Sequence, residues 1–202
     1  MPPINKTSAG LRERKKAKAM AAVQRHALRL FRENGYQETT VEQIAEAAEI
    51  SQSTFFRYFK TKEDVLIIDN YDPILIAEIK NQPEELSPLA AVRNAMLSGV
   101  AGMSAAEIKT ARERIEVIMS IPELRSASVS NMYGTMDMIA EQVAARLGVT
   151  SDNWSVKVLA GAVTGACSAV LLHYAEHPEA DLAELLQDAF HQLELGLRGD
   201  IN

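Results

Sequence analysis

The apolar residues of this chain recur mostly at spacings of three and four, the period of a helix with one buried face. The first such stripe predicts a helix from Leu11 to Asn34, closed at Gly35 because glycine readily takes the left-handed backbone of a helix end. Its apolar positions are Met20, Val23, Ala27, Leu30 and Phe31. Beyond Pro73 the pattern is again helical, without the alternation typical of strands, so the sequence predicts an all-α protein.

Residues 39–66 predict two short helices and the start of a third. Two pairs with capping-box spacing open the first helix, and either threonine can be its cap: Thr39 with Glu42, and Thr40 with Gln43. Ser51 can cap a second helix beginning at Gln52. Because about three residues join these helices, they must cross steeply, which is the geometry of a helix-turn-helix. A third helix is expected to open at the Thr61 and Asp64 pair and to run towards Pro73.

The rest of the chain predicts five more helices from their start and stop signals. The expected starts are Ser87-Pro88, Ser104 with Glu107, Pro122, Ser151-Asp152 and Asp181, and the expected ends include Gly148, His177-Pro178 and Leu197. The predicted layout is a flexible basic arm over residues 1–14, a helix-turn-helix domain over 15–66 and a larger helical domain over 67–202.

The two parts of the chain differ in charge. Residues 1–62 hold 12 lysines and arginines against 6 aspartates and glutamates, and residues 63–202 hold the remaining 9 against 21, out of totals of 21 and 27. A basic segment beside an acidic remainder suits a phosphate-binding module joined to a body that phosphate repels. A protein with an ordinary, uneven distribution of surface charge would give the same numbers, so charge alone does not establish DNA binding.

Cysteine content and apolar run length bear on the compartment. The single cysteine, Cys167, cannot form an internal disulfide, and the chain does not begin like a secretory signal, so a reducing cytoplasm is expected. The longest nearly uncharged run, residues 158–172, is shorter than the roughly 20 residues that a membrane helix needs. It is expected to be a buried helix, and no membrane partner is predicted.

The second helix of a helix-turn-helix enters the major groove of DNA with its N-terminal residues. The expected DNA-binding residues are Thr40, Gln52, Ser53, Thr54, Arg57, Tyr58 and Lys62. Glutamine can bind adenine through two hydrogen bonds, arginine can bind guanine or phosphate, and serine or threonine can serve either role. Phe55 and Phe59, four residues apart, are expected to pack a small core. A polar helix surface without a partner is the competing interpretation.

Residues 20–66 resemble the N-terminal domain of the TetR family of bacterial repressors. The resemblance rests on a succession of segments: Gly35-Tyr36, Thr39-Thr40, Ile44-Ala45, Ile50-Ser51, residues 54–59 (TFFRYF) and residues 62–66 (KEDVL). It implies phosphate contacts from Thr40, Tyr58 and Lys62, with the remaining predicted residues on the recognition helix. It also implies an all-α ligand-binding and dimerisation domain in the rest of the chain.

Three positions depart from the family pattern. Glu49 stands in the turn where the family usually has glycine, which predicts strain or a positive φ there. Ser53 stands where glycine or another small residue is frequent, and because serine is also small, this difference is expected to have little effect on DNA binding. Phe56 stands where a phosphate-binding tyrosine is common, so one backbone contact is expected to be lost. The basic arm can compensate by entering the minor groove, or it is a solvated tail; deletion of residues 1–14 would decide.

The last two predicted helices are expected to form a homodimer interface, as the resemblance implies. The helix from about Ser151 carries many small residues, which let another helix approach closely: Ala160, Gly161, Ala162, Gly165, Ala166, Ser168 and Ala169. The last helix carries a broad apolar stripe: Leu182, Leu185, Leu186, Ala189, Phe190, Leu193 and Leu197. Packing inside one subunit is the alternative. A dimer places two recognition helices about 34–36 Å apart, which matches a palindromic operator.

Methionines in the central helices predict a pocket for a small hydrophobic effector, since methionine adapts to varied apolar ligands. The expected lining is Met96, Ile118, Met119, Met132, Tyr133, Met136 and Val163, with ordinary core as the alternative for each residue. A lipid, an acyl thioester or an aromatic compound would suit it, and Arg93, Arg112 or Arg114 could hold an acidic group. Trp154 is expected to anchor a helix start rather than to gate the pocket.

The sequence therefore predicts a transcriptional regulator, most simply a repressor released from DNA by its effector. An activator, or a DNA-binding protein without an effector, fits the same residues. An enzyme is not expected, because His173 and His177 form only a pair on one helix face and the chain shows no zinc-protease, phosphate-loop or nucleophile-elbow motif. No cofactor or metal is predicted. The operator, the effector and the regulated genes cannot be named from the sequence.

Overall fold

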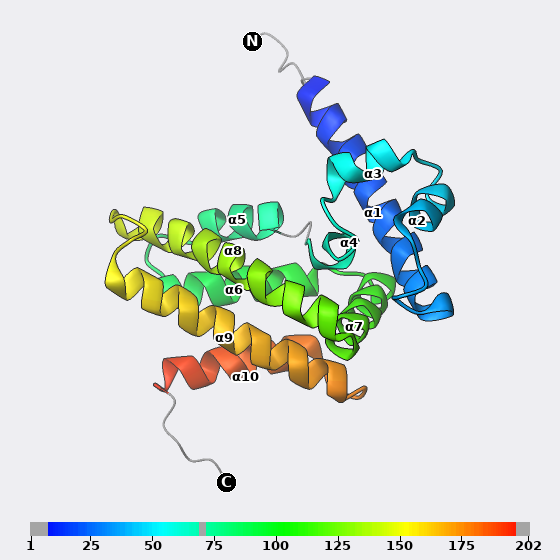
Figure 1. The fold of residues 1–202 in the computed structure, drawn as a ribbon. Coiled ribbons are helices and arrows are strands. Elements are labelled where there is room, and N and C mark those ends of the chain that lie inside the picture. Colours follow the sequence, from blue (N-terminus) through cyan, green and yellow to red (C-terminus); the bar gives the residue numbers. More distant parts are fainter. Residues whose placement is uncertain (1–7, 69–71, 197–202) are drawn as a thin grey trace. The chain divides into compact units, whose positions relative to one another are not determined.

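The computed structural model of the protein describes residues 8–68 and 72–196, with side chains described for 19–68 and 75–196. All regular secondary structure in those residues is α-helical, as predicted (Figure 1). The chain divides into two compact units, a first unit of residues 1–68 and a second unit of residues 69–202.

Residues 8–68, the described part of the first unit, form four helices. They are α1 (Ser8–Asn34), α2 (Val41–Ala47), α3 (Gln52–Tyr58) and α4 (Asp64–Ile67). Helix α1 buries Met20, Val23, Ala27 and Phe31 as predicted, but Leu28 rather than Leu30 completes the stripe. It begins at Ser8, so residues 8–14 of the expected flexible arm are helical; residues 1–7 lie outside the described residues.

Hydrogen bonds from nearby side chains determine where the short helices of the first unit begin. Thr40, not Thr39, caps α2 in a full capping box with Gln43, whereas the Thr39 hydroxyl is buried and donates to the Gly35 and Leu30 carbonyls. The Thr61 and Asp64 pair forms reciprocal bonds, with Asp64 also accepting from the backbone of Lys60. Helix α4 is nevertheless short and ends at Ile67, so the single helix expected from Thr61 towards Pro73 is wrong.

The end of α2 explains the unusual Glu49. The Ile50 amide donates to Ala45 and the Glu49 amide to Glu46, which is the double hydrogen-bond pattern that closes a helix through one left-handed residue. Glu49 supplies that residue with φ of 55°, and it is the only residue other than glycine with positive φ in the described part of the chain. The predicted positive φ at Glu49 is therefore confirmed.

Replacement of Glu49 by glycine is expected to stabilise the protein by about 0.5–1 kcal/mol, because a side chain in the left-handed region carries a steric penalty that glycine lacks. Chemical denaturation measures the gain. The matched control is Glu46→Gly, an exposed position within α2, which is expected to lose about 1 kcal/mol through helix propensity. Equal destabilisation by both changes would contradict the strain at Glu49.

The described residues of the second unit form six helices. They are α5 (Asp72–Asn81), α6 (Pro88–Ala101), α7 (Ala105–Ser120), α8 (Pro122–Leu147), α9 (Trp154–Glu176) and α10 (Leu182–Glu194). The predicted caps Ser87, Ser104 and Asp181 are confirmed, but Asn153 rather than Ser151 or Asp152 caps α9. Leu197, the expected end of the last helix, lies outside the described residues.

The core of the second unit lies where α8, α9 and α10 meet α6. Helices α9 and α10 run side by side in opposite directions, and α8 packs along the other side of α9 (Figure 1). The central positions of the core are Val92 on α6, Ile139 and Val143 on α8, Val163 on α9 and Phe190 on α10.

Candidate nucleic-acid interface and ligand cavity

Helix α3 has one buried and one exposed face. Phe55 and Phe59 are fully buried with ring centroids 5.4 Å apart, so the prediction that they pack the core is confirmed. Gln52, Ser53 and Arg57 are exposed on the same short helix. The helix thus presents polar side chains to solvent from a fixed hydrophobic base, as a recognition helix requires.

The N-terminus of α3 is held by hydroxyl groups. Ser51 accepts a hydrogen bond from the Thr54 amide at 3.1 Å, and its hydroxyl lies 3.0 Å from that of Thr54 and 2.9 Å from that of Ser53. Thr54 is half-buried in this cluster. Ser53 and Gln52 therefore stand further out than Thr54 at the helix start, where free amide groups also attract phosphate.

Thr40 occupies the corresponding place on α2. Its hydroxyl oxygen accepts from the Gln43 amide at 3.2 Å, and its own amide donates to the Gln43 side chain at 2.8 Å. Both bonds leave the hydroxyl hydrogen able to donate. Thr40 is exposed, so this donor is accessible to a phosphate oxygen.

Arg57 and Tyr58 lie together at the end of α3. The Arg57 guanidinium is 5.1 Å from the centre of the Tyr58 ring, and its Nη2 lies 3.4 Å from the Tyr58 hydroxyl. Phe56, which replaces the tyrosine common in the family, is about half exposed and touches the Phe55 ring edge-on. Because Arg57 and Tyr58 lie side by side, both side chains can contact the same stretch of nucleic acid.

Lys62 has a structural role that the sequence did not indicate. Its ammonium donates to the Tyr36 carbonyl at 2.8 Å and the Thr39 carbonyl at 3.1 Å, and lies 3.9 Å from the centre of the Tyr36 ring. It holds the loop between α1 and α2, directly before Thr40. A phosphate contact from Lys62 would use its third N–H group.

Glu63 completes this cluster by accepting a hydrogen bond from the Tyr36 hydroxyl. Burial alone would raise the pKa of Glu63, but the hydrogen bonds from Tyr36, its own backbone and Thr61, with the charge of Lys62, outweigh burial and lower the pKa. The carboxylate is therefore ionised at neutral pH and ties the α1–α2 loop to the start of α4.

The second unit contains an apolar cavity of about 210 Å³. It is bordered by Leu75, Ala95, Met96, Gly99, Val100, Met103, Ala111, Arg114, Ile115, Leu171, Leu182 and Leu186. These residues come from α5, α6, α7, α9 and α10, except Met103, which lies in the loop between α6 and α7. Arg114 is the one charged residue in this described lining.

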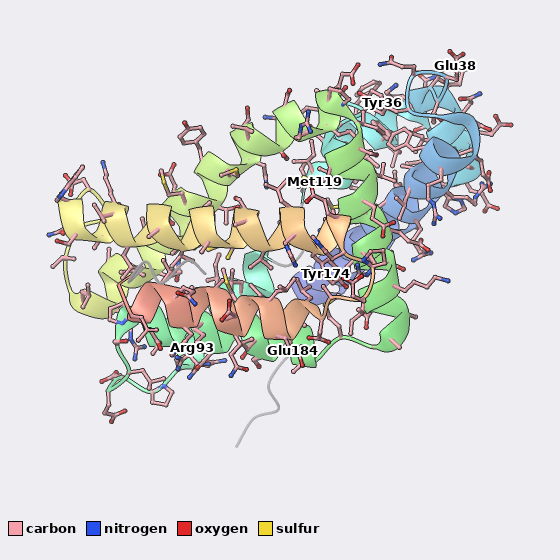
Figure 2. All side chains as sticks on the ribbon, turned by 90° about the horizontal axis from the view of Figure 1, so that it is seen from below. Tyr36, Glu38, Arg93, Met119, Tyr174 and Glu184 are labelled. Atoms are coloured by element: carbon pink, nitrogen blue, oxygen red, sulfur yellow. The ribbon has the colours of Figure 1, made fainter. Side chains whose placement is uncertain are left out.

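Of the seven residues predicted to line a pocket, only Met96 borders this cavity. Ile118 and Val163 are buried, and Met119, labelled on α7 in Figure 2, is half-buried. The three predicted residues of α8 lie elsewhere: Met132 contacts the Ser168 hydroxyl, Met136 packs against the core, and Tyr133 is 65% exposed. The other lining residues had no local signal, because the cavity joins five helices.

The three arginines considered for an acidic ligand have different surroundings. Arg112 donates to the carbonyls of Tyr174, His177 and Ala180 at 2.6–3.1 Å and lies 3.7 Å from the centre of the buried Tyr174 ring. Tyr174 lies near the end of α9 (Figure 2). Arg112 thus fastens α7 to the turn between α9 and α10.

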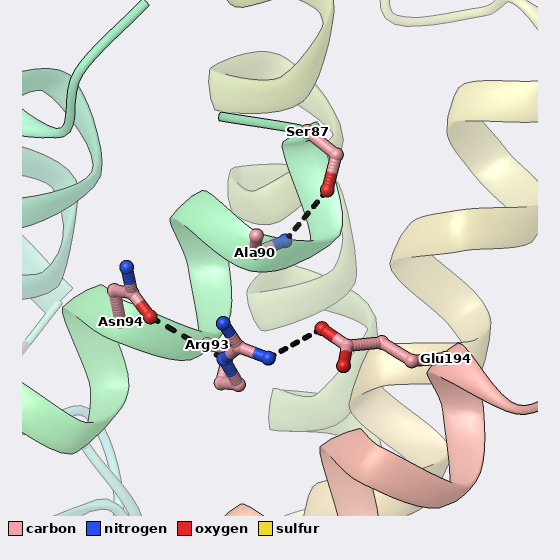
Figure 3. A network of polar contacts seen from close by, with 5 residues as sticks. All are labelled: Ser87, Ala90, Arg93, Asn94 and Glu194. Atoms are coloured by element: carbon pink, nitrogen blue, oxygen red, sulfur yellow. Dashed lines mark hydrogen bonds and ion pairs between the residues drawn. The ribbon is translucent and has the colours of Figure 1, made fainter. Parts of the chain in front are cut away.

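Arg93 is engaged at the other end of α10. Its guanidinium forms an ion pair with Glu194 at 2.5 Å and donates to the Asn94 side chain at 3.3 Å (Figure 3). Arg93 and Arg112 therefore connect helices, and only Arg114 of the three borders the cavity.

Helix α9 buries one face and exposes an apolar stripe on the other, so the expectation of a buried helix holds for one face only. The stripe consists of Trp154, Val158, Ala162, Gly165, Ala169 and Leu172. Trp154 is 78% exposed and does not anchor the helix start; with Leu89 and Leu193 it borders a surface hollow of about 330 Å³. Among the described residues α9 is also the one helix long and apolar enough to cross a membrane, while its other face packs on α8 and α10.

His173 and His177 stack with ring centroids 3.8 Å apart, and His177 Nδ1 lies 2.9 Å from the His173 carbonyl. Within the described part of the chain, no group of three histidine, cysteine or acidic residues could hold a metal ion.

An N-terminal helix-turn-helix and a larger helical unit with a cavity define the class of a DNA-binding transcriptional regulator. Residues 25–67 match the family described as bacterial regulatory proteins, tetR family, and residues 86–198 match the family of MftR C-terminal domains. The chain belongs to the TetR family of transcriptional regulators, as the resemblance implied, and it is not an enzyme.

Two relatives with assigned roles are similar over most of their length. The transcriptional regulator TcmR of Streptomyces glaucescens is 34% identical over 71% of this chain and 67% of its own. MftR of Mycobacterium tuberculosis, which is described as a putative transcriptional regulator of mycofactocin biosynthesis, is 26% identical over 85% of this chain and 87% of its own.

Solved structures share the fold. Thermus thermophilus FadR, a repressor solved with lauroyl-CoA, is 26% identical with a TM-score of 0.56, covering 91% of this chain and 95% of its own. The complex of SmeT with triclosan, where SmeT is the repressor of a Stenotrophomonas maltophilia efflux pump, is 21% identical with a TM-score of 0.57, covering 89% of this chain and 90% of its own.

Proposed function

We propose that this regulator is a repressor that binds a palindromic operator as a homodimer and is released by a small hydrophobic effector. The observation that carries the proposal is the exposed polar face of α3, with Gln52, Ser53 and Arg57 above the buried Phe55 and Phe59. A protein with this role would act in the cytoplasm, where it meets DNA.

Base contacts are assigned to the exposed face of α3. Gln52 is suited to adenine and Arg57 to guanine, since both side chains can form paired hydrogen bonds in the major groove. Ser53 and Thr54 meet base edges or phosphate at the helix start. Thr40 and Tyr58 bind phosphate on either side, and Lys62 adds one phosphate contact while it holds the loop before Thr40.

Replacement of Arg57 by alanine is expected to weaken operator binding about 5- to 150-fold, the range for losing a base contact or a charged partner. The measurement is a titration of DNA from upstream of the protein's own gene and its neighbours at two salt concentrations. Arg29→Ala is the matched control, because Arg29 is exposed on α1 and pairs with Glu33. Weak, sequence-indifferent binding by the native protein and both variants would contradict a DNA-reading function.

The dimer is assigned to α9 and α10. The apolar stripe on α9 is exposed in the single chain, and its central positions are alanine and glycine, so a second α9 can approach closely. An exposed apolar stripe along a whole helix is typical of a partner interface rather than of a free surface. Trp154 and the hollow beside it suit an aromatic contact at the edge of that interface.

The effector is assigned to the cavity bordered by Met96. FadR of Thermus thermophilus, solved with lauroyl-CoA, and SmeT, solved with triclosan, support a small apolar ligand in this fold. Leu75 of α5 also borders the cavity, and α5 is the first described helix after the helix-turn-helix unit along the chain. In this proposal a ligand that moves α5 changes the spacing of the recognition helices. Unaltered operator affinity in the presence of a bound ligand would contradict this release.

A further inference from the structure

The proposed effector site has a chemical character that defines its ligand more closely. The described lining is apolar except for Arg114, which lies on α7 among Ala111, Ile115 and the side chains of α6 and α10. We infer that the cavity binds a molecule with an apolar tail and one anionic group, and that Arg114 holds the anionic group.

Electrostatics favours an anion over a neutral or cationic head group. A guanidinium presents a planar fork of N–H donors that matches the two oxygens of a carboxylate. In surroundings of low polarity such charge-assisted hydrogen bonds are stronger than in water, and they offset the cost of removing the carboxylate from solvent. An alcohol would gain a weaker bond, and an ammonium group would be repelled.

The volume limits the length of the tail. About 210 Å³ is below the roughly 300–1,000 Å³ of sites that enclose drug-sized ligands. A short chain therefore fits the cavity without large rearrangement. Met96 on α6 and Met103 in the loop between α6 and α7 give the wall the adaptability that a flexible tail needs.

The inference rests on the proposed function, and three probes with the same tail test it: octanoate, octan-1-ol and octylamine. Calorimetric titration of the full-length protein is expected to give octanoate an affinity about 10- to 100-fold above that of octan-1-ol, with octylamine weaker still. Arg114→Gln is expected to remove the preference for octanoate and to leave the affinity for octan-1-ol nearly unchanged. Arg93→Gln is the matched control and is expected to keep the preference, because Arg93 does not border the cavity.

Equal affinities of the native protein for octanoate and octan-1-ol, or no binding of octanoate, would overturn the inference without any variant. An Arg93 variant that loses the preference as fully as the Arg114 variant would overturn it as well. Operator binding, measured on the same samples, distinguishes a failure of this inference from a failure of the proposed function. Normal operator binding without head-group preference rejects the inference alone, whereas absent operator binding rejects the proposed function.

Discussion

Replacement of Ala162 by arginine is expected to convert the proposed dimer to a monomer and to lower operator affinity about 100-fold or more. Ala162 is exposed in the middle of the α9 stripe, so a long charged side chain is tolerated by the single chain but blocks a second α9. A monomer engages one half-site at a time and loses the gain from joining two binding events. Analytical ultracentrifugation and operator titration measure the two effects.

Ala106→Arg is the matched control for this change. Ala106 is also an exposed alanine in a helix, on α7 and away from the α9 stripe, so the same charge is added at a different surface. It is expected to remain dimeric and to bind the operator with nearly native affinity. A dimeric Ala162 variant would show that the subunits meet elsewhere.

Replacement of Phe55 by alanine is expected to remove about 3–5 kcal/mol of stability from the first unit, the usual cost of truncating a fully buried phenylalanine. Such a loss is comparable to the total stability of a small domain. Operator binding is expected to disappear. Hydrogen exchange measures the effect locally, with protection lost over residues 20–67 and retained in the core of the second unit.

The neighbouring residue provides the control, since Phe56 is about half exposed and Phe55 is fully buried. Phe56→Ala is expected to keep the protection of the first unit, with a small loss from the missing edge-on ring contact. Loss of protection across both units in the Phe55 variant would mean that the two units unfold together.

The features that the sequence predicted well are local. A helix start depends on a cap and its near neighbours, so Ser104 with Glu107 and Ser87 before Pro88 could be identified from the chain alone, whereas the choice between Thr39 and Thr40 could not. The buried and the exposed face of α3 could be predicted in the same way, because the helical period determines which residues within two turns share a face. The positive φ of Glu49 was predictable from the turn that it occupies.

The features that the sequence missed depend on distant neighbours. The cavity is formed by five helices, so the methionine count on α8 did not predict its lining, and only Met96 agrees. Lys62 is held by carbonyls more than 20 residues earlier, which no local pattern reveals. The exposure of Trp154 likewise depends on what α9 packs against, and a sequence without its fold cannot specify that.

Arg112 and Arg114 stand two residues apart on α7, one fastened to the turn between α9 and α10 and the other bordering the cavity. Because a helix moves nearly as a rigid body, a ligand that displaces α7 at Arg114 also pulls the turn that joins the two proposed interface helices. Ligand occupancy and subunit association then share one free energy of coupling, which acts equally in both directions. The concentration of effector needed for release would therefore depend on the concentration of the regulator itself, and sparse and abundant expression would give the cell two different thresholds.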